Sequence, residues 1–203
     1  MSDIGPIVFV VDDDISVRNS LRLLIESAGW KPEMFGSARE FLARPRVPAP
    51  SCLLLDVYLP DINGCDLQTQ LADRIDLPII FMSGHGDVPM TARVMKAGAA
   101  DFFTKPFFND QMLNAIRDAI ERSRAALNSQ ERMRELRDHY ATLSPRQREV
   151  MALVVGGRLN KQVGGDLGIS EITVKAHRGE LMRKMHAQSL PDLVRMAERL
   201  SIT

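Results

Sequence analysis

Two apolar stretches of this sequence end in a carboxylate. The run Ile7 to Val11 is followed directly by Asp12, and the run Cys52 to Leu55 is followed by Asp56. Burying a lone carboxylate is costly, so each acid is expected either at a solvent-facing edge or beside a cation. Lys105, which follows the short apolar stretch "DFFT", is a cation in a comparable position.

The apolar stretches have the features of strands that could bring these residues together. Within the first 127 residues, uninterrupted apolar runs alternate with segments of helical periodicity, which favours a parallel sheet covered by helices on both faces. We predict strands at 7–11, 32–35, 52–56, 78–83 and 101–104. Such open sheets form their sites at the carboxyl ends of the strands. The expected fold is α/β, with a doubly wound, five-stranded parallel sheet of flavodoxin-like type.

Three carboxylates at one edge of a sheet repel each other unless a cation lies among them. Asp12, Asp13 and Asp56 offer only hard oxygen ligands, which suits Mg²⁺ in a partly hydrated octahedral site. Ser83 ends the fourth predicted strand and would add a hydroxyl at the same edge. A carboxylate nucleophile, Mg²⁺, a hydroxyl and Lys105 are the groups that phosphoryl transfer needs, with Asp56 attacking phosphorus.

Each of these residues taken alone has an ordinary structural explanation. Asp14 and Asp61 are interpreted as surface acids, Ser83 could be a turn residue, and Phe102 could simply belong to the core. His85 is interpreted as a loop residue, because no second histidine or cysteine stands near it to share a metal. The set of acids together with the lysine is what favours a common site.

Charge is distributed unevenly along the chain. Residues 1–127 hold 13 basic and 17 acidic side chains, residues 141–203 hold 10 and 6, and the formal net charge is zero. This asymmetry indicates two domains with different partners, and the basic one is a candidate for binding nucleic acid.

Composition and cysteine content exclude several classes of protein. No run of about 18 apolar residues exists, so no membrane span is expected. The first apolar run lacks a preceding basic segment and is interpreted as a strand, not a signal peptide. Two cysteines do not make a disulfide framework in a chain of 203 residues. We expect a cytoplasmic protein.

The C-terminal part of the chain is helical in pattern. Ser144, followed by Pro145 and Gln147, predicts a helix start with a capping box. Further helices are predicted at 145–155, 160–167, 171 to about 186 and from about 191 onward. Two helices joined by a short turn containing glycine form a helix-turn-helix.

A long segment without proline or glycine joins the two parts. Residues 109–140 are predicted to form one helix that continues as a linker, although a kink near Asn128 and Ser129 is an alternative. The predicted domains are therefore residues 1–124, a helical linker at 125–140, and residues 141–203.

Several motifs carry a family resemblance. The segments "VVDDD", "LLLDVYLPDINGCD", "FMSGHGD" and "FFTKPF" resemble the receiver domain of two-component response regulators. The segments "LSPRQREVMALVVGG", "NKQVGGDLGISEITVKAHRGELMRKM" and "SLPDLVRMA" resemble the LuxR-type effector domain of the NarL/FixJ family, closest to the FixJ type. The resemblance covers nearly the whole chain, in order and at matching spacing.

The resemblance implies roles for the acid cluster. Asp56 would be the phosphoacceptor, and a sensor histidine kinase would be the phosphoryl donor. Asp13, Asp56 and the backbone carbonyl of Tyr58 would be ligands of Mg²⁺, with Asp12 acting mainly through water. Lys105 would contact the phosphoryl group.

The resemblance also implies a switch. Ser83 would hydrogen-bond the phosphoryl group and move on activation, Phe102 would be the switch aromatic, and the peptide bond Lys105–Pro106 would be cis. The face made by the fifth strand and the helices about 88–97 and 109 onward would then pair with its copy in a homodimer.

The predicted recognition helix has two faces. Its buried side is expected to hold Val174, Leu181 and Met185, which recur at spacings of seven and four. In the family the matching base-facing positions are Lys175, Ala176 and Gly179, the phosphate-facing ones are Asn160, Lys161 and Thr173, and Arg178 is a further candidate for contact with DNA. Glycine at 179 departs from the larger residues often found there, so either the backbone approaches DNA closely or the position is unused. Gly164 and Gly165 are a second departure.

The function expected is that of a phosphorylation-dependent transcriptional regulator, which is not an enzyme beyond its own phosphorylation and dephosphorylation. Double-stranded DNA with an inverted-repeat operator and RNA polymerase are further expected partners. The apolar stripe Leu193, Ala197 and Leu200 could extend the dimer contact.

Two alternatives come from other classes. An aspartate-nucleophile phosphatase needs a general acid two residues after the nucleophile, where this chain has Tyr58. A DNA-binding module with a degenerate receiver is disfavoured by the intact set of acids.

Overall fold

The chain forms two compact units in this computed structural model, which describes residues 5–84 and 88–202. The first unit spans Met1–Asn128 and the second spans Ser129–Thr203. His85, interpreted above as a loop residue, lies outside the described residues. Among the described residues, no helix combines the length and apolar character that crossing a membrane requires.

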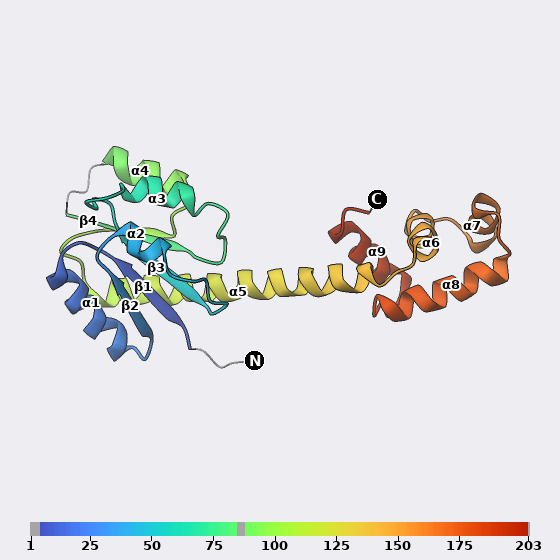
Figure 1. Cartoon of the computed structure of the whole chain (residues 1–203), viewed down its shortest axis with the longest axis horizontal. Coiled ribbons are helices and arrows are strands. Elements are labelled where there is room, and N and C mark those ends of the chain that lie inside the picture. The colour runs from blue at the N-terminus through green and yellow to red at the C-terminus, as the bar shows by residue number, and fades with distance from the viewer. Residues whose placement is uncertain (1–4, 85–87, 203) are drawn as a thin grey trace. The chain divides into compact units, whose positions relative to one another are not determined.

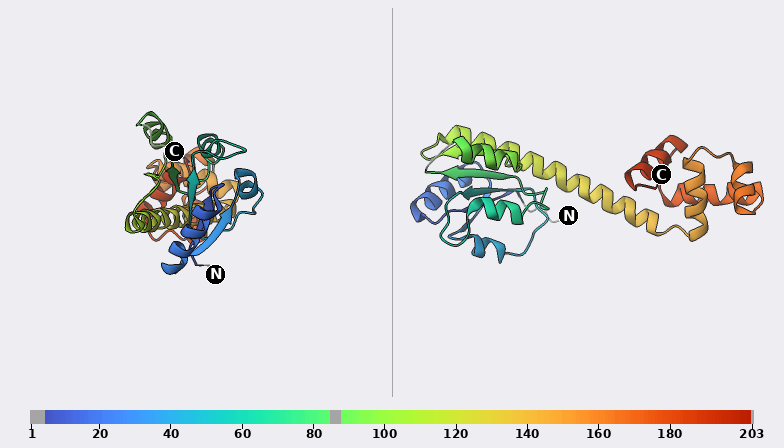
Figure 2. Two further views of the ribbon diagram at one scale, coloured as in Figure 1. Left: turned by 90° about the vertical axis from the view of Figure 1, so that its left-hand side faces the viewer. Right: turned by 90° about the horizontal axis from the view of Figure 1, so that it is seen from above.

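The first unit is built on the five predicted strands. They are parallel and lie in the order β2-β1-β3-β4-β5. Figures 1 and 2 show the sheet with the helices around it. Their bounds are β1 (Ile7–Val11), β2 (Lys31–Phe35), β3 (Ser51–Asp56), β4 (Ile79–Ser83) and β5 (Asp101–Thr104). The predicted doubly wound fold is confirmed, and each strand begins and ends within one residue of the prediction.

Helices cover both faces of this sheet, which explains why the strands are apolar without alternation. Phe9, Leu53 and Phe81 face one core, whereas their chain neighbours Val8 and Leu54 face another. The first core is closed by α2 (Ala38–Leu42), α3 (Gly64–Gln70) and α4 (Val88–Lys96). The second is closed by α1 (Ile15–Ser27) and α5 (Asn109–Ala141).

The second unit contains α6 (Pro145–Val155), α7 (Asn160–Leu167), α8 (Glu171–Lys184) and α9 (Leu190–Arg199). The predicted capping box between Ser144 and Gln147 is present at the start of α6. Gly168, at φ 65°, ends α7 in the left-handed conformation that glycine adopts without strain, and α8 follows after a short turn. The predicted helix-turn-helix pair, α7 and α8, is thereby confirmed.

The end of α5 belongs to the core of the second unit. The helix is unbroken at Asn128 and Ser129, and Leu136 near its end is only 5% exposed. Leu136 packs in one hydrophobic cluster with residues of α6, α8 and α9. In the same cluster Leu193 and Ala197 are fully buried. The expectation that their stripe extends a dimer contact is therefore wrong, because the domain's own core already uses it.

Candidate functional site

The carboxyl ends of the strands bring the predicted acids together. β1 and β3 are neighbours, and their register pairs Val11 with Leu55, so Asp12 and Asp56 follow at adjacent positions. Ser83 ends β4, where it pairs with Thr104, the residue before Lys105.

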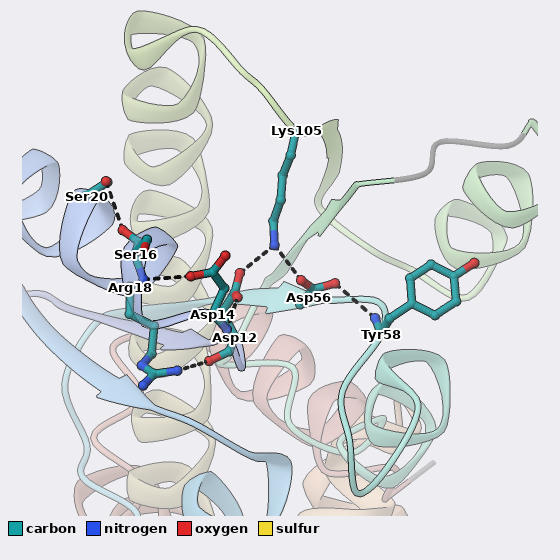
Figure 3. A network of polar contacts seen from close by, with 8 residues as sticks. All are labelled: Asp12, Asp14, Ser16, Arg18, Ser20, Asp56, Tyr58 and Lys105. Carbon is teal, nitrogen blue, oxygen red and sulfur yellow. Dashed lines mark hydrogen bonds and ion pairs between the residues drawn. The ribbon is translucent and has the colours of Figure 1, made fainter.

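Lys105 supplies the cation that the buried acids require. Its Nζ lies 2.6 Å from Asp12 Oδ2 and also forms an ion pair with Asp56 Oδ2, as Figure 3 shows. Asp12 is fully buried and Asp56 is 7% exposed. The ammonium group compensates the cost of placing two carboxylates out of water.

Burial and pairing act in opposite directions on these groups. Burial lowers the pKa of Lys105, but its hydrogen bonds and charge interactions with Asp12 and Asp56 outweigh burial, and the net pKa is raised. Burial raises the pKa of Asp12 above its ordinary value, although Lys105 opposes this shift. Lys105 therefore remains protonated and positively charged beside the carboxylates.

Backbone N–H groups fix the orientation of both carboxylates, and a side-chain donor holds the backbone at Asp12 (Figure 3). Asp12 Oδ1 accepts a hydrogen bond of 2.9 Å from the N–H of Asp14, and Arg18 Nη1 donates to the Asp12 carbonyl oxygen at 2.6 Å. Asp56 Oδ1 accepts from the N–H of Tyr58 at 2.9 Å. Each acid is held by the turn that follows its own strand.

Gly64 permits a close approach behind Asp56. A Cβ atom at residue 64 would lie 2.6 Å from the backbone oxygen of Asp56 and 3.1 Å from the Cα of Val57. The N–H of Gly64 donates to the Val57 carbonyl at 2.9 Å. The first residue of α3 therefore packs directly on the backbone that presents Asp56.

Two acids interpreted as surface residues also have structural roles: Asp14 is exposed, as interpreted, and Asp61 is half-buried. Asp14 caps α1 by accepting from the N–H of Ser16 at 2.7 Å. Asp61 accepts from the N–H groups of Ala38 at 3.3 Å and Arg39 at 2.9 Å, at the start of α2. Asp14 precedes a helical pattern, so sequence could have identified its cap, whereas the role of Asp61 depends on residues 22 and 23 positions away.

The remaining predicted receiver residues lie around the same edge. Asp12, Asp13 and Asp56 offer carboxylate oxygens within 4.8 Å of one another, the hard donor set that suits Mg²⁺. Ser83 is fully buried, and the peptide bond between Lys105 and Pro106 is cis, as predicted. Phe102 is half-buried at the rim of the core.

The second site is the exposed face of α8. Val174, Leu181 and Met185 are fully buried, as predicted. On the opposite side, the predicted base-facing residues are exposed: Lys175, Ala176 and Gly179. Lys175 forms an ion pair of 3.2 Å with Glu171, one turn earlier.

The predicted phosphate-facing residues differ in their availability. Lys161 is exposed, whereas Asn160 and Arg178 are half-buried and bonded to each other, Nη1 to Oδ1, at 2.6 Å. These three residues line a groove of about 410 Å³. The Thr173 hydroxyl lies 2.8 Å from Ser170 Oγ, within the cap of α8.

The two units have the architecture of a regulator that joins an acidic α/β domain to a DNA-binding helix-turn-helix. Comparisons with known proteins support this two-domain architecture. Residues 8–117 match the response regulator receiver domain, and residues 141–197 match the bacterial regulatory proteins of the luxR family. The chain belongs to the response regulators that combine a receiver with a LuxR-type DNA-binding domain, and the predicted NarL/FixJ resemblance is confirmed.

Relatives match the chain over nearly its whole length. Nodulation protein W of Bradyrhizobium diazoefficiens is 52% identical over 97% of this chain and 87% of its own. Transcriptional regulatory protein FixJ of Rhizobium meliloti is 42% identical over 94% of each chain. The solved structure of response regulator StyR aligns with a TM-score of 0.85 at 43% identity, covering 96% of this chain and 99% of that one. FixJ and StyR are named as regulators, and the phosphatase alternative finds no support among these relatives.

Proposed function

We propose that Asp56 accepts a phosphoryl group from a sensor histidine kinase, and that this phosphorylation raises the affinity of the protein for its DNA operator. The observation that carries the proposal is the ion-pair arrangement of Lys105 between Asp12 and Asp56. Asp56 is the better nucleophile of the two acids, because it keeps some exposure while Asp12 is fully buried.

Each residue of the site would have its own role in phosphoryl transfer. Asp12, Asp13, Asp56 and the backbone carbonyl of Tyr58 would hold Mg²⁺, which when bound neutralises charge on the transferred group. The Asp56 oxygen forms the bond to phosphorus as the bond to the donor nitrogen breaks. Lys105 then exchanges its contact with Asp56 for one with a phosphoryl oxygen, and the Ser83 hydroxyl donates to another.

Mass spectrometry tests the acceptor directly. Incubation with acetyl phosphate and Mg²⁺ is expected to add one phosphoryl group that hydroxylamine removes, and Asp56→Asn abolishes this addition. Asp61→Asn is the matched control, because Asp61 lies in the loop after Asp56 and accepts hydrogen bonds from backbone N–H groups at the start of α2. Equal labelling of Asp56→Asn and the wild-type protein would refute the assignment.

The output we propose is pairing of two receivers. Movement of Ser83 toward the phosphoryl group frees space for Phe102, which borders a groove of about 380 Å³ between α4 and β5. Val88, at the start of α4 and 81% exposed, gives this face an apolar edge. A second copy of the same face would cover it, and the two-fold symmetry of the dimer calls for an inverted-repeat operator, where the protein would recruit RNA polymerase.

A further inference from the structure

Ile172 is an apolar side chain that lies outside the hydrophobic core of its domain. It is the second residue of α8, and it is 80% exposed. Single exposed apolar residues are common on protein surfaces, so exposure alone carries no meaning. The position of Ile172 on α8 is what distinguishes it.

Ile172 lies on the face of α8 that is turned away from the domain core. Residues three, four and seven positions apart share one side of a helix. Ile172 therefore shares its side with Lys175, Ala176 and Gly179, all of which are exposed, whereas Val174 is fully buried on the other side. In helix-turn-helix proteins the N-terminal residues of the second helix contact base edges in the major groove.

The chemistry of this face is mostly apolar. Ala176 and Gly179 carry no side-chain hydrogen-bond donor, and the ammonium group of Lys175 is paired with Glu171 at 3.2 Å. A Cβ added at Gly179 would meet nothing within 4 Å, so packing inside the domain does not require a glycine there. The third turn of this face therefore carries no side chain, and Ile172 is the large apolar side chain at its N-terminal end.

The apolar feature that the major groove offers is the C5-methyl group of thymine. We propose that Ile172 determines operator specificity by packing against a thymine methyl in each half-site. The inference rests on the proposed operator binding and names a base that the operator contains.

Removal of single methyl groups from DNA tests this contact. An operator is first selected from random double-stranded DNA with the acetyl-phosphate-treated full-length protein. Each thymine of that operator is then replaced by deoxyuridine, which removes only the C5-methyl group. At one position in each half-site, this replacement is expected to weaken binding of the wild-type protein about four-fold, the value of one buried methyl group.

The Ile172→Ala variant should lose this sensitivity and bind thymine and deoxyuridine operators equally. It is expected to fold as well as the wild-type protein, because alanine favours helix and the isoleucine is exposed. Ile15→Ala is the matched control. It truncates another isoleucine, 63% exposed on α1, and should keep the wild-type response to deoxyuridine.

The outcomes separate the two proposals. If an operator is selected but no deoxyuridine changes the affinity, or if Ile172→Ala keeps the wild-type response, the inference about Ile172 is overturned while operator binding stands. If the phosphorylated protein selects no sequence, both proposals fall.

Discussion

At the scale of single residues, Lys105 determines whether the negative charge of the acidic site is compensated. The lysine compensates two carboxylates, of which Asp12 is fully buried, so its removal leaves their negative charge without a cation beside it. We expect Lys105→Met to lower the free energy of unfolding by about 2 kcal/mol without Mg²⁺. Mg²⁺ should recover more of the stability in the variant than in the wild-type protein.

Thermal melts with and without MgCl₂ measure this difference. Lys96→Met removes a lysine at the end of α4 and serves as the control. An identical Mg²⁺-induced shift in Lys105→Met and the wild-type protein would contradict the role assigned to the lysine.

Gly64 is the second residue whose identity follows from the structure. Because a Cβ there would lie 2.6 Å from the Asp56 carbonyl oxygen, the Gly64→Ala variant must displace that backbone or the start of α3. We expect a loss of about 1–3 kcal/mol in stability and slower labelling by acetyl phosphate. Gly165→Ala, at a position with nothing within 4 Å, should label at the wild-type rate. Unchanged labelling of Gly64→Ala would show that the position of the Asp56 backbone does not depend on a glycine at residue 64.

At the scale of elements, one ion pair joins the edge strand β2 to the chain after α2. Arg44 Nη2 donates to Glu33 Oε1 at 2.9 Å, Arg44 Nε also binds this carboxylate, and the guanidinium lies 4.6 Å from the centre of the Phe9 ring. The hydrogen bonds from Arg44 hold the pKa of Glu33 below its ordinary value of 4.5, despite partial burial.

A depressed folded-state pKa means that the pair stabilises the fold above about pH 4.5 and loses this effect as the pH falls through the folded-state pKa. Glu33→Gln is expected to cost about 1 kcal/mol at pH 7 and almost nothing below the folded-state pKa. Urea unfolding across this range measures the cost, with exposed Glu26→Gln as the control. A cost that does not depend on pH would contradict the ion-pair explanation.

The glycines of α7 and α8 give a matched pair of substitutions. Gly165 and Gly179 lie inside these helices, and a Cβ at either would meet nothing within 4 Å. Alanine should stabilise the protein by up to about 1 kcal/mol at each position. If α8 approaches DNA closely at Gly179, only Gly179→Ala weakens operator binding. Equal affinity of both variants would mean that position 179 is unused.

At the scale of the whole molecule, phosphorylation is expected to change the association state. Sedimentation at matched micromolar concentration should show a mostly monomeric unphosphorylated protein and a phosphorylated dimer with higher operator affinity. Val88→Glu would place a charge at the rim of the α4–β5 groove and should prevent the dimer without preventing phosphorylation. A dimer of equal strength in both forms, with unchanged DNA affinity, would refute pairing as the output.

The local pattern of the sequence determined the elements and the class of the protein. Apolar runs such as Ile7–Val11 have no alternation because both faces of the sheet are covered, and capping residues such as Ser144 mark helix starts. These signals are short-range, so they predicted all five strands and the helix-turn-helix. The sequence does not predict the strand order, but the carboxyl ends of parallel strands share one edge of a sheet, which is why Asp12, Asp56 and Lys105 could be expected together.

Only the tertiary structure decided which groups those residues contact. It placed Lys105 beside Asp12 and Asp56 and assigned Asp61 to the start of α2. It buried Leu193 and Ala197 in the core of their own domain and left Ile172 outside the hydrophobic cores. The physical reason is that ion pairing and packing depend on distances between residues far apart in the chain. Periodicity can show that a side chain is apolar or charged, but the fold determines what lies beside it.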